Sequence, residues 1–267
     1  MEVLWNGPAH ETDFSHQAAI VDDLINRHVA VILVAPSDQN AMVPVIERAH
    51  RSGIPLIIFD SAANAENYVS FVATDNYGGG VLAARRMAKI LGEKGEVAMI
   101  GVLPGAASAV AREKGFRETL EKEFPEVKLV AFQYGMADRA KSLAVAEDFL
   151  TAHPDLDGIF GSAEPASIGA VQAIKNRGLA GKVKMIGFDT SPTLVEDLKT
   201  GIIDSLVLQD PFTMAYRAFK TLEEKIEGGT PPRRIDLPPV LATSENFREP
   251  DIYRLIEPQE EIDRYLK

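Results

Sequence analysis

The sequence contains no cysteine, and only 7% of its residues are aromatic. Without cysteine there is no disulfide, no thiolate nucleophile and no thiolate-ligated metal. Apolar runs stay well short of the roughly 18 residues that a membrane-spanning helix requires. Basic residues are also scarce, 28 against 39 acidic ones, which gives a formal net charge of −11. Such a charge repels a phosphate backbone, so we do not expect nucleic acid as a partner of this chain.

The composition is otherwise that of a globular protein. The chain has 267 residues, of which 46% are hydrophobic and 25% charged, enough for one large domain or two small ones. Strand-length apolar runs such as residues 30–34 and 54–59 alternate with helical patterns such as residues 13–27 up to about residue 220. This alternation predicts an α/β fold with doubly wound, mostly parallel sheets. Residues 3–5 are predicted as a further short strand, and the segment after Gly228 as irregular apart from a strand at 240–242.

Two of the predicted strands end in the same way. One runs into Phe59-Asp60-Ser61 and the other into Phe188-Asp189-Thr190. In open parallel sheets, ligands bind outside the carboxyl ends of the strands, so these aspartates indicate where a binding cleft lies. The alternative interpretation is that each aspartate caps the next helix.

The common catalytic motifs are absent. The sequence has no Walker-type loop, no His-Glu-x-x-His zinc site and no Gly-x-Ser-x-Gly elbow. We therefore expect neither an enzyme nor a cofactor or metal ion. The polar residues that remain at strand ends and helix starts are Asp60, Arg112, Asp189 and Gln209. Carboxylates and a guanidinium fork suit a ligand with many hydroxyls, such as a sugar, although Arg112 could simply belong to the polar first turn of a helix.

Several short motifs together resemble one family over residues 3–243. The chain resembles the ribose-type sugar-binding proteins of bacterial ABC importers, called periplasmic binding protein type I, and the related effector domains of LacI-type repressors. The fragments that carry this resemblance are Ala35-Pro36-Ser37-Asp38, Gly53-Ile54-Pro55, Thr74-Asp75-Asn76, Arg112 with Gly115-Phe116, Ala152-His153-Pro154-Asp155, Ile186-Gly187-Phe188-Asp189 and Gln209-Asp210-Pro211.

The resemblance implies two doubly wound, Rossmann-like lobes joined by a three-segment hinge, with a monosaccharide or related polyol held between them. Lobe one would comprise residues 1–74 and 210–243, and lobe two residues 75–209 and 244–267. The hinge would lie near residues 74–75, 209–210 and 243. The four polar residues at strand ends and helix starts named above match family positions that bind sugar hydroxyls.

The chain also departs from the family pattern. Ala35 stands where relatives often have Asn, Ala137 where many have an aromatic residue, and Ala163-Glu164 where the family has Asn-Asp. These changes argue against ribose itself as the ligand. Glu164 would either replace a lost ligand group or cap the helix that begins at Pro165.

A strand and a helix with which the family opens are not matched before residue 3. We interpret Met1 as a misassigned start or the result of a truncation, with a signal peptide expected further upstream. Because a central strand would then be lacking, we expect either a lower stability than that of a chain extended upstream or a strand-exchanged homo-oligomer.

The leading hypothesis is a periplasmic solute receptor that binds a carbohydrate and delivers it to the ABC permease subunits of the inner membrane. The alternative is the cytoplasmic effector-binding domain of a LacI-type transcription regulator. The coding sequence upstream of Met1 would separate the two, since it would encode a signal peptide in the first case and a helix-turn-helix in the second.

Overall fold

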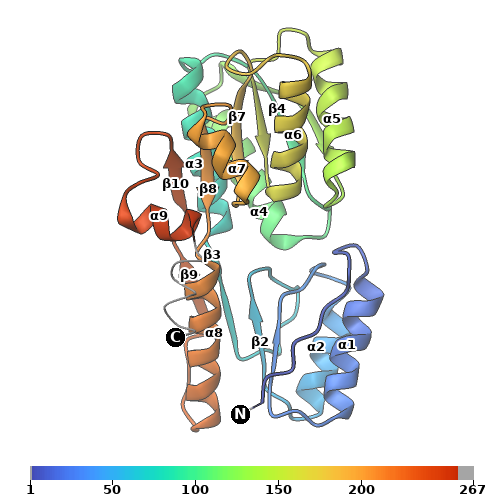
Figure 1. The fold of residues 1–267 in the computed structure, drawn as a ribbon. Coiled ribbons are helices and arrows are strands. Elements are labelled where there is room, and N and C mark those ends of the chain that lie inside the picture. Colours follow the sequence, from blue (N-terminus) through green and yellow to red (C-terminus); the bar gives the residue numbers. More distant parts are fainter. Residues whose placement is uncertain (1, 258–267) are drawn as a thin grey trace. The chain divides into compact units, whose positions relative to one another are not determined.

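The computed structural model describes residues 2–257, which form two compact α/β units (Figure 1). Unit 1 comprises Met1–Thr74, Gly105–Ser108 and Pro211–Leu237, and unit 2 comprises Asp75–Pro104, Ala109–Asp210 and Pro238–Lys267. Each unit contains its own sheet. Met1 and residues 258–267, which the predicted lobes include, lie outside the described residues.

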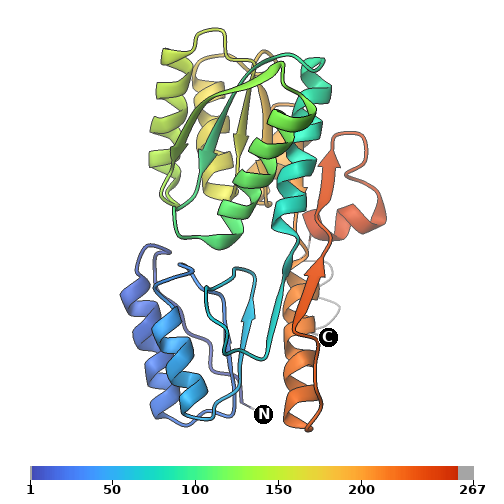
Figure 2. The same ribbon diagram turned by 180° about the vertical axis from the view of Figure 1, so that it is seen from behind.

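Unit 1 is built on a parallel sheet in the order β1-β2-β3-β9. Helices α1 and α2 cover one face of this sheet and α8 covers the other (Figures 1 and 2). Side chains alternate between the faces, so that Ile58 packs toward α1 and α2 while Ile57 packs toward α8. The elements of this unit are α1 (Phe14–Asn26), β1 (Ile32–Val34), α2 (Val43–Arg51), β2 (Leu56–Phe59), β3 (Ser70–Thr74), α8 (Pro211–Ile226) and β9 (Arg234–Leu237).

Two elements of unit 1 differ from the sequence prediction. Strand β9 was not predicted, because prolines surround it, yet it pairs with β3 as an edge strand of the described sheet. Residues 3–5 were predicted as a strand and form none, and the side chains of Val3 and Trp5 are 61% and 91% exposed. Strand propensity is realised only where a neighbouring strand supplies backbone partners.

Unit 2 is built on a larger sheet, with the strand order β10-β8-β7-β6-β4-β5. All neighbours in it are parallel except β10, which runs antiparallel to β8. Helices α3 and α4 cover one face and α5, α6 and α7 the other, which explains why its strands are continuous apolar runs. The elements are α3 (Asn76–Leu91), β4 (Gly95–Gly101), α4 (Ala107–Glu123), β5 (Val127–Tyr134), α5 (Arg139–Ala152), β6 (Gly158–Gly161), α6 (Glu164–Asn176), β7 (Lys184–Phe188), α7 (Pro192–Lys199), β8 (Ser205–Leu208), β10 (Val240–Thr243) and α9 (Pro250–Ile256).

Helix ends in unit 2 follow ordinary capping chemistry. Asp75 accepts a hydrogen bond from Gly78 N at the start of α3, and Gly92 ends the helix in the left-handed conformation. Gly80 allows α3 to lie directly against α4, since a Cβ there would clash with the carbonyl oxygen of Arg112. The glycine at this position is therefore required by the close packing of the two helices.

The strand order of unit 2 reverses between β4 and β6. From β4 the chain crosses to β5 on one side and then returns to β6 on the other side of β4. At such a switch point the two crossover connections leave in opposite directions, and a crevice opens at the carboxyl ends of the strands. The residues that follow β4, β6, β7 and β8 lie at this end of the sheet.

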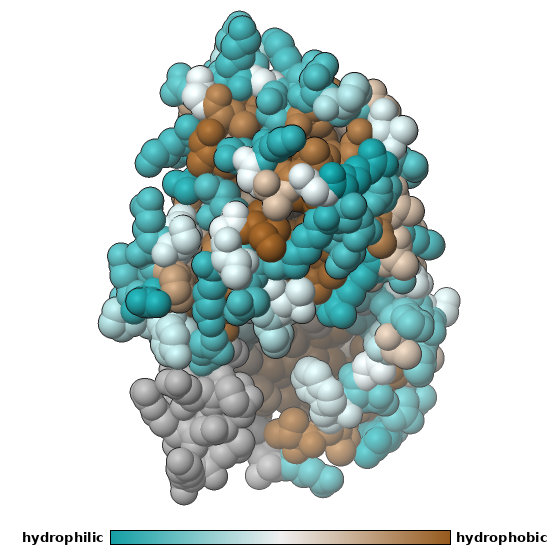
Figure 3. Space-filling model, turned by 45° about the horizontal axis from the view of Figure 1, so that its top comes forward, coloured by the Kyte–Doolittle hydropathy of each residue, from teal (hydrophilic) through white to brown (hydrophobic). Residues whose placement is uncertain are grey.

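Most of the face seen in Figure 3 is hydrophilic, and hydrophobic residues show there in separate areas. None of the helices within residues 2–257 combines the length and the apolar character needed to cross a bilayer.

Candidate functional site

A cluster of polar residues lies at the carboxyl ends of three neighbouring strands of unit 2. Ser162 and Glu164 follow β6, Asp189 follows β7 and Gln209 follows β8. Because β6, β7 and β8 are adjacent in the sheet, these residues are brought together although they are far apart in sequence. The fold thus unites three of the predicted site residues, Glu164, Asp189 and Gln209.

Asp189 is the centre of this cluster. Its Oδ1 accepts a hydrogen bond from Gln209 Nε2 at 2.7 Å, and its Oδ2 accepts one from the backbone N–H of Glu164 at 3.3 Å. Arg112 Nη1 lies 3.6 Å from the same Oδ2. The side chain remains 25% exposed, so the carboxylate is held in place and still reaches solvent. The alternative interpretation of Asp189 as a cap is wrong, because Ser191 caps the helix that follows.

Arg112 projects from α4 into the same cluster and is only 4% exposed. Its Nε donates to Asn76 Oδ1 at 2.8 Å, and its Nη1 donates to the carbonyl oxygen of Ser162 at 3.0 Å. The guanidinium carbon lies 3.7 Å from the centre of the Phe188 ring, a cation–π contact. Arg112 is therefore not an exposed residue of a polar helix turn. It is a fixed fork of donors next to a carboxylate.

Gln209 contributes an acceptor as well as a donor. Its Nε2 donates a hydrogen bond to Asp189, while its Oε1 is buried and has no hydrogen-bond partner among the described residues. Buried polar atoms are normally paired, so an acceptor of this kind suits a hydroxyl group of a ligand. Together, Asp189 and Gln209 offer the alternating donors and acceptors that hydroxyl-rich molecules require.

Glu164 is the first residue of α6, and its side chain forms an ion pair with Arg139, with 2.5 Å between Oε1 and Nη2. Ala163 precedes the helix without a side-chain capping bond, and among the described residues the side chain of Glu164 bonds to Arg139 rather than to the first turn of the helix. The helix-cap alternative for Glu164 is therefore not supported. The other alternative, that its carboxylate contacts the ligand, stays a prediction.

Asp60 belongs to unit 1, where it follows β2. Its backbone adopts a left-handed conformation, with φ of 64°, and its N–H donates to the carbonyl oxygen of Val72 at 2.9 Å. The next element of the chain is strand β3, so the interpretation of Asp60 as a helix cap is wrong.

Sequence reasoning missed three residues that complete the cluster in unit 2: Asn76, Glu113 and Ser162. Glu113 is buried beside Arg112, and its Oε1 accepts hydrogen bonds from Val102 N at 3.2 Å and from Ser162 Oγ at 3.1 Å. Burial raises the pKa of Glu113 to about 7, against the opposing effect of these hydrogen bonds. One signal was present in the sequence: the three consecutive charged residues 112–114, which stand beside Gly115-Phe116.

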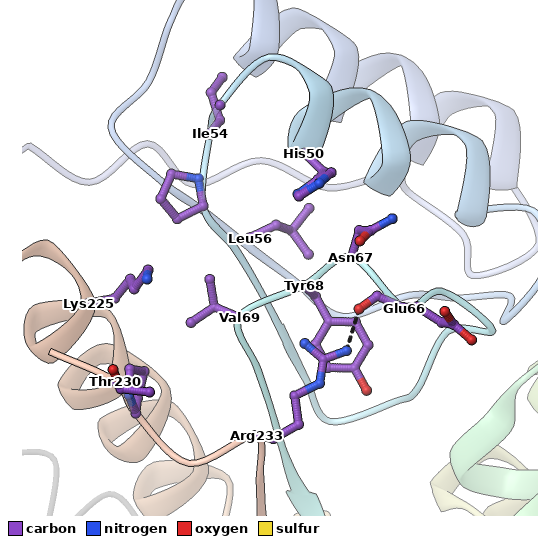
Figure 4. A pocket seen from close by; sticks show the side chains of 13 residues that line it. His50, Ile54, Leu56, Glu66, Asn67, Tyr68, Val69, Lys225, Thr230 and Arg233 are labelled. Atoms are coloured by element: carbon purple, nitrogen blue, oxygen red, sulfur yellow. Dashed lines mark hydrogen bonds between the residues drawn. The ribbon is translucent and has the colours of Figure 1, made fainter. Parts of the chain in front are cut away.

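A cavity of unit 1 lies away from the predicted site. Its wall includes Leu56 and Val69, at the amino ends of β2 and β3, whereas Asp60 follows the carboxyl end of β2 (Figure 4). Arg233 stacks on the ring of Tyr68, with 3.6 Å to the ring centre, and donates to the carbonyl oxygen of Glu66. The guanidinium of Arg233 is thus engaged by other residues of the cavity wall. In the described part of the chain, no group of His, Asp and Glu side chains is arranged to hold a metal ion.

The comparisons with known proteins agree with this architecture. The family described as "Periplasmic binding protein domain" matches residues 1–230. The D-ribose/D-allose-binding protein of Pseudomonas aeruginosa is 31% identical over 241 residues, which cover 88% of this chain and 75% of that protein. The ribose import binding protein of Bacillus subtilis is 30% identical over 233 residues, covering 87% and 75%.

Solved structures give the same result. An ABC transporter solute-binding protein from Agrobacterium vitis with bound D-fucose has a TM-score of 0.92 and 34% identity, covering 96% of this chain and 89% of that one. A carbohydrate transporter solute-binding protein from Agrobacterium radiobacter in complex with D-arabinose has a TM-score of 0.89 and 33% identity, covering 92% and 85%. The fold is that of a ligand-binding protein made of two parallel-sheet lobes. The chain belongs to the periplasmic binding protein family.

Proposed function

We propose that this protein binds a carbohydrate, a monosaccharide or related polyol, without converting it, and delivers it to an ABC importer. The observation that carries the proposal is the held but solvent-accessible carboxylate of Asp189, flanked by Arg112 and by the unpaired acceptor of Gln209. Charge-assisted hydrogen bonds from fixed groups bind hydroxyls strongly and with directional selectivity. The family and the sugars named with its relatives support this assignment over a transcription regulator.

The ligand contacts that we propose come from both units. Asp60 of unit 1 and Arg112, Glu164, Asp189 and Gln209 of unit 2 would bind hydroxyl groups of one sugar. One ligand bound by all of them would link the two units, so we propose a hinged closure on the ligand. The hinge would lie near residues 74–75, 209–210 and 243; the boundaries between units 1 and 2 include Thr74/Asp75 and Asp210/Pro211.

Calorimetry with D-fucose, D-arabinose, D-allose and D-ribose tests the proposed function. At least one of these sugars should bind with an affinity in the micromolar range or tighter, and none should be chemically altered after incubation with the protein. If all four fail to bind at millimolar concentration, or if the protein turns one over, the proposed function is wrong.

The proposed partners are the permease subunits of an inner-membrane ABC importer, and the proposed location is the periplasm. In proteoliposomes that contain the cognate importer, the sugar-loaded protein should stimulate ATP hydrolysis more than the sugar-free protein does. Equal stimulation by the two forms would argue against delivery.

We also propose that the open edge of β1 pairs with a strand from a second copy of the chain. Ile32 N donates to Pro55 O, so the N–H and C=O of Leu33 face away from β2, where no described strand pairs with them. An apolar cavity of about 400 Å³ adjoins this edge and is lined in part by Trp5 and Phe219. Unpaired edges next to apolar surface favour strand addition, and residues 3–5 have the composition of a strand.

Light scattering after size exclusion tests this pairing. The protein should elute as a dimer, Leu4→Pro should shift it to a monomer because proline removes a ladder donor, and Glu2→Pro should leave the dimer intact. A wild-type monomer, or a Leu4→Pro dimer, would contradict strand exchange.

A further inference from the structure

Glu113 connects the carboxyl ends of two strands at the switch point of unit 2. Its Oε1 accepts from Val102 N, directly after β4, and from Ser162 Oγ, directly after β6. These two strands are neighbours in the sheet. The chain crosses from β4 to β5 on one side and from β6 to β7 on the other side. Gly101 makes the approach possible, since a Cβ there would lie 2.7 Å from Glu113 Oε1. The carboxylate is therefore fixed between the carboxyl ends of β4 and β6.

The turn that Glu113 holds is also the turn on which the proposed ligand-binding groups depend. The carbonyl oxygen of Ser162 accepts from Arg112 Nη1 at 3.0 Å, while its hydroxyl donates to Glu113. Two residues further on, the N–H of Glu164 donates to Asp189 Oδ2. One buried side chain thus fixes a turn that contacts both Arg112 and Asp189.

The charged surroundings of Glu113 come from its own helix and from β5. Arg112 and Arg117 of α4 favour the ionised carboxyl, whereas burial opposes it, and the net result is a pKa of about 7. On the other side lies Tyr134 of β5, whose pKa is raised mainly by burial and further by the charge of Glu113. The ionised carboxylate is the stronger acceptor for the Val102 and Ser162 donors.

We propose that Glu113 is a positioning residue for ligand binding, and that its ionised carboxylate fixes the turn after β6 so that Arg112 and Asp189 keep their binding geometry. Glu113 does not itself touch the ligand. The inference rests on the proposed sugar-binding function. It adds that sugar affinity falls when this carboxyl is protonated.

The test combines calorimetry with NMR. D-Fucose and D-arabinose are titrated into the wild type, Glu113→Gln and the control Glu121→Gln at about pH 5.5 and about pH 8.5. Glu121 is exposed on the same helix, so its substitution controls for a charge change on α4. In the sugar-free protein, the Arg112 Nε–H and Glu164 amide signals are followed through the same pH range.

For the wild type and Glu121→Gln we expect affinity to be about tenfold weaker at the lower pH, because protonation weakens an acceptor of two hydrogen bonds. Glu113→Gln should be about tenfold weaker at the higher pH and independent of pH. The Arg112 and Glu164 signals should titrate near neutral pH in the wild type and stay constant in Glu113→Gln. Ser162→Ala keeps the carboxylate of Glu113 but removes the hydroxyl that donates to it, so this variant should also weaken sugar binding. It provides the test of the inference if Glu113→Gln does not fold.

Two results would overturn the inference. One is an unchanged affinity in folded Glu113→Gln or in Ser162→Ala, and the other is the absence of a Glu113-dependent titration at Arg112 and Glu164. If neither sugar binds, the proposed function fails for these ligands, while the NMR titration still decides whether Glu113 controls the turn.

Discussion

Asp60 and Asp189 occupy the same backbone conformation in two different sheets. Each follows a phenylalanine at the end of a parallel strand, with φ of 64° and 68° respectively. Each donates its N–H to the carbonyl oxygen of a valine in the neighbouring strand, Val72 or Val207, at 2.9 Å. A left-handed backbone is uncommon for residues other than glycine, and here it recurs at the carboxyl ends of two parallel strands.

Replacing Asp189 by alanine should weaken sugar binding by about 2–4 kcal/mol, because Arg112 and Gln209 then lose their charged partner. Calorimetry with the sugar that binds the wild type measures the effect, and Asp155→Ala, at an exposed position, is the control. Unchanged affinity in Asp189→Ala would assign the carboxylate a purely structural role.

At Asp60, two substitutions separate the contribution of the carboxylate to binding from the contribution of the backbone conformation to stability. Glycine accepts a φ of 64° without strain, whereas alanine does not, so Asp60→Gly should be more stable than Asp60→Ala by about 1 kcal/mol. Both variants should lose sugar affinity if the carboxylate binds the ligand. Urea denaturation and calorimetry give the two quantities, and wild-type affinity in Asp60→Gly would remove Asp60 from the proposed site.

Glu113 should make stability depend on pH. Its pKa is raised from 4.5 to about 7 in the folded protein, so the folded state binds a proton more tightly than the unfolded state. Its favourable contribution is fully present below about pH 4.5 and is lost as the pH rises through about 7, a change of about 3 kcal/mol.

Urea unfolding of the wild type and Glu113→Gln at a series of pH values checks this sign. The stability of the wild type relative to the variant should decrease between the two pKa values. A constant difference across that range would show that Glu113 does not titrate as proposed. As the pH rises, Glu113→Gln should therefore gain stability relative to the wild type. Its sugar affinity at high pH should nevertheless be lower than that of the wild type.

Ligand binding should also bring the two units together. Asp60 belongs to unit 1, and Arg112 and Asp189 belong to unit 2, so a sugar bound by all three, as we propose, would link the two units. Small-angle scattering should show a smaller radius of gyration with saturating sugar than without it, and Asp189→Ala should show no change at the same sugar concentration. An identical radius in the wild type, with binding verified by calorimetry, would favour a rigid pocket.

How far the sequence predicts this structure depends on the range of the interactions involved. The parallel strands were predictable because runs such as residues 54–59 are apolar on both faces, and the start of α3 because Asp75 supplies a local cap. Strand β9 was not predictable from the sequence. Its residues alternate between exposed and half-buried positions and are flanked by prolines, so they form a strand only through pairing with β3.

The same distinction holds for the candidate site. The aspartates at the ends of β2 and β7 follow from the rule that ligands bind at the carboxyl ends of parallel strands. Glu113 and Ser162 are 49 positions apart, and nothing local in either segment indicates that one accepts a hydrogen bond from the other. Their contact exists only because the sheet places β4 beside β6.

The close packing of α3 on α4 has a thermodynamic consequence for recognition. A side chain at Gly80 would clash with the carbonyl oxygen of Arg112, and one at Gly115 would clash with the carbonyl oxygen of Tyr77, so the two helices cannot shift independently without loss of contact. Arg112 on α4 and its acceptor Asn76 on α3 are consequently ordered together during folding. The conformational entropy of this long side chain, about 2 kcal/mol for a free arginine, is lost before any ligand arrives and need not be lost again upon binding.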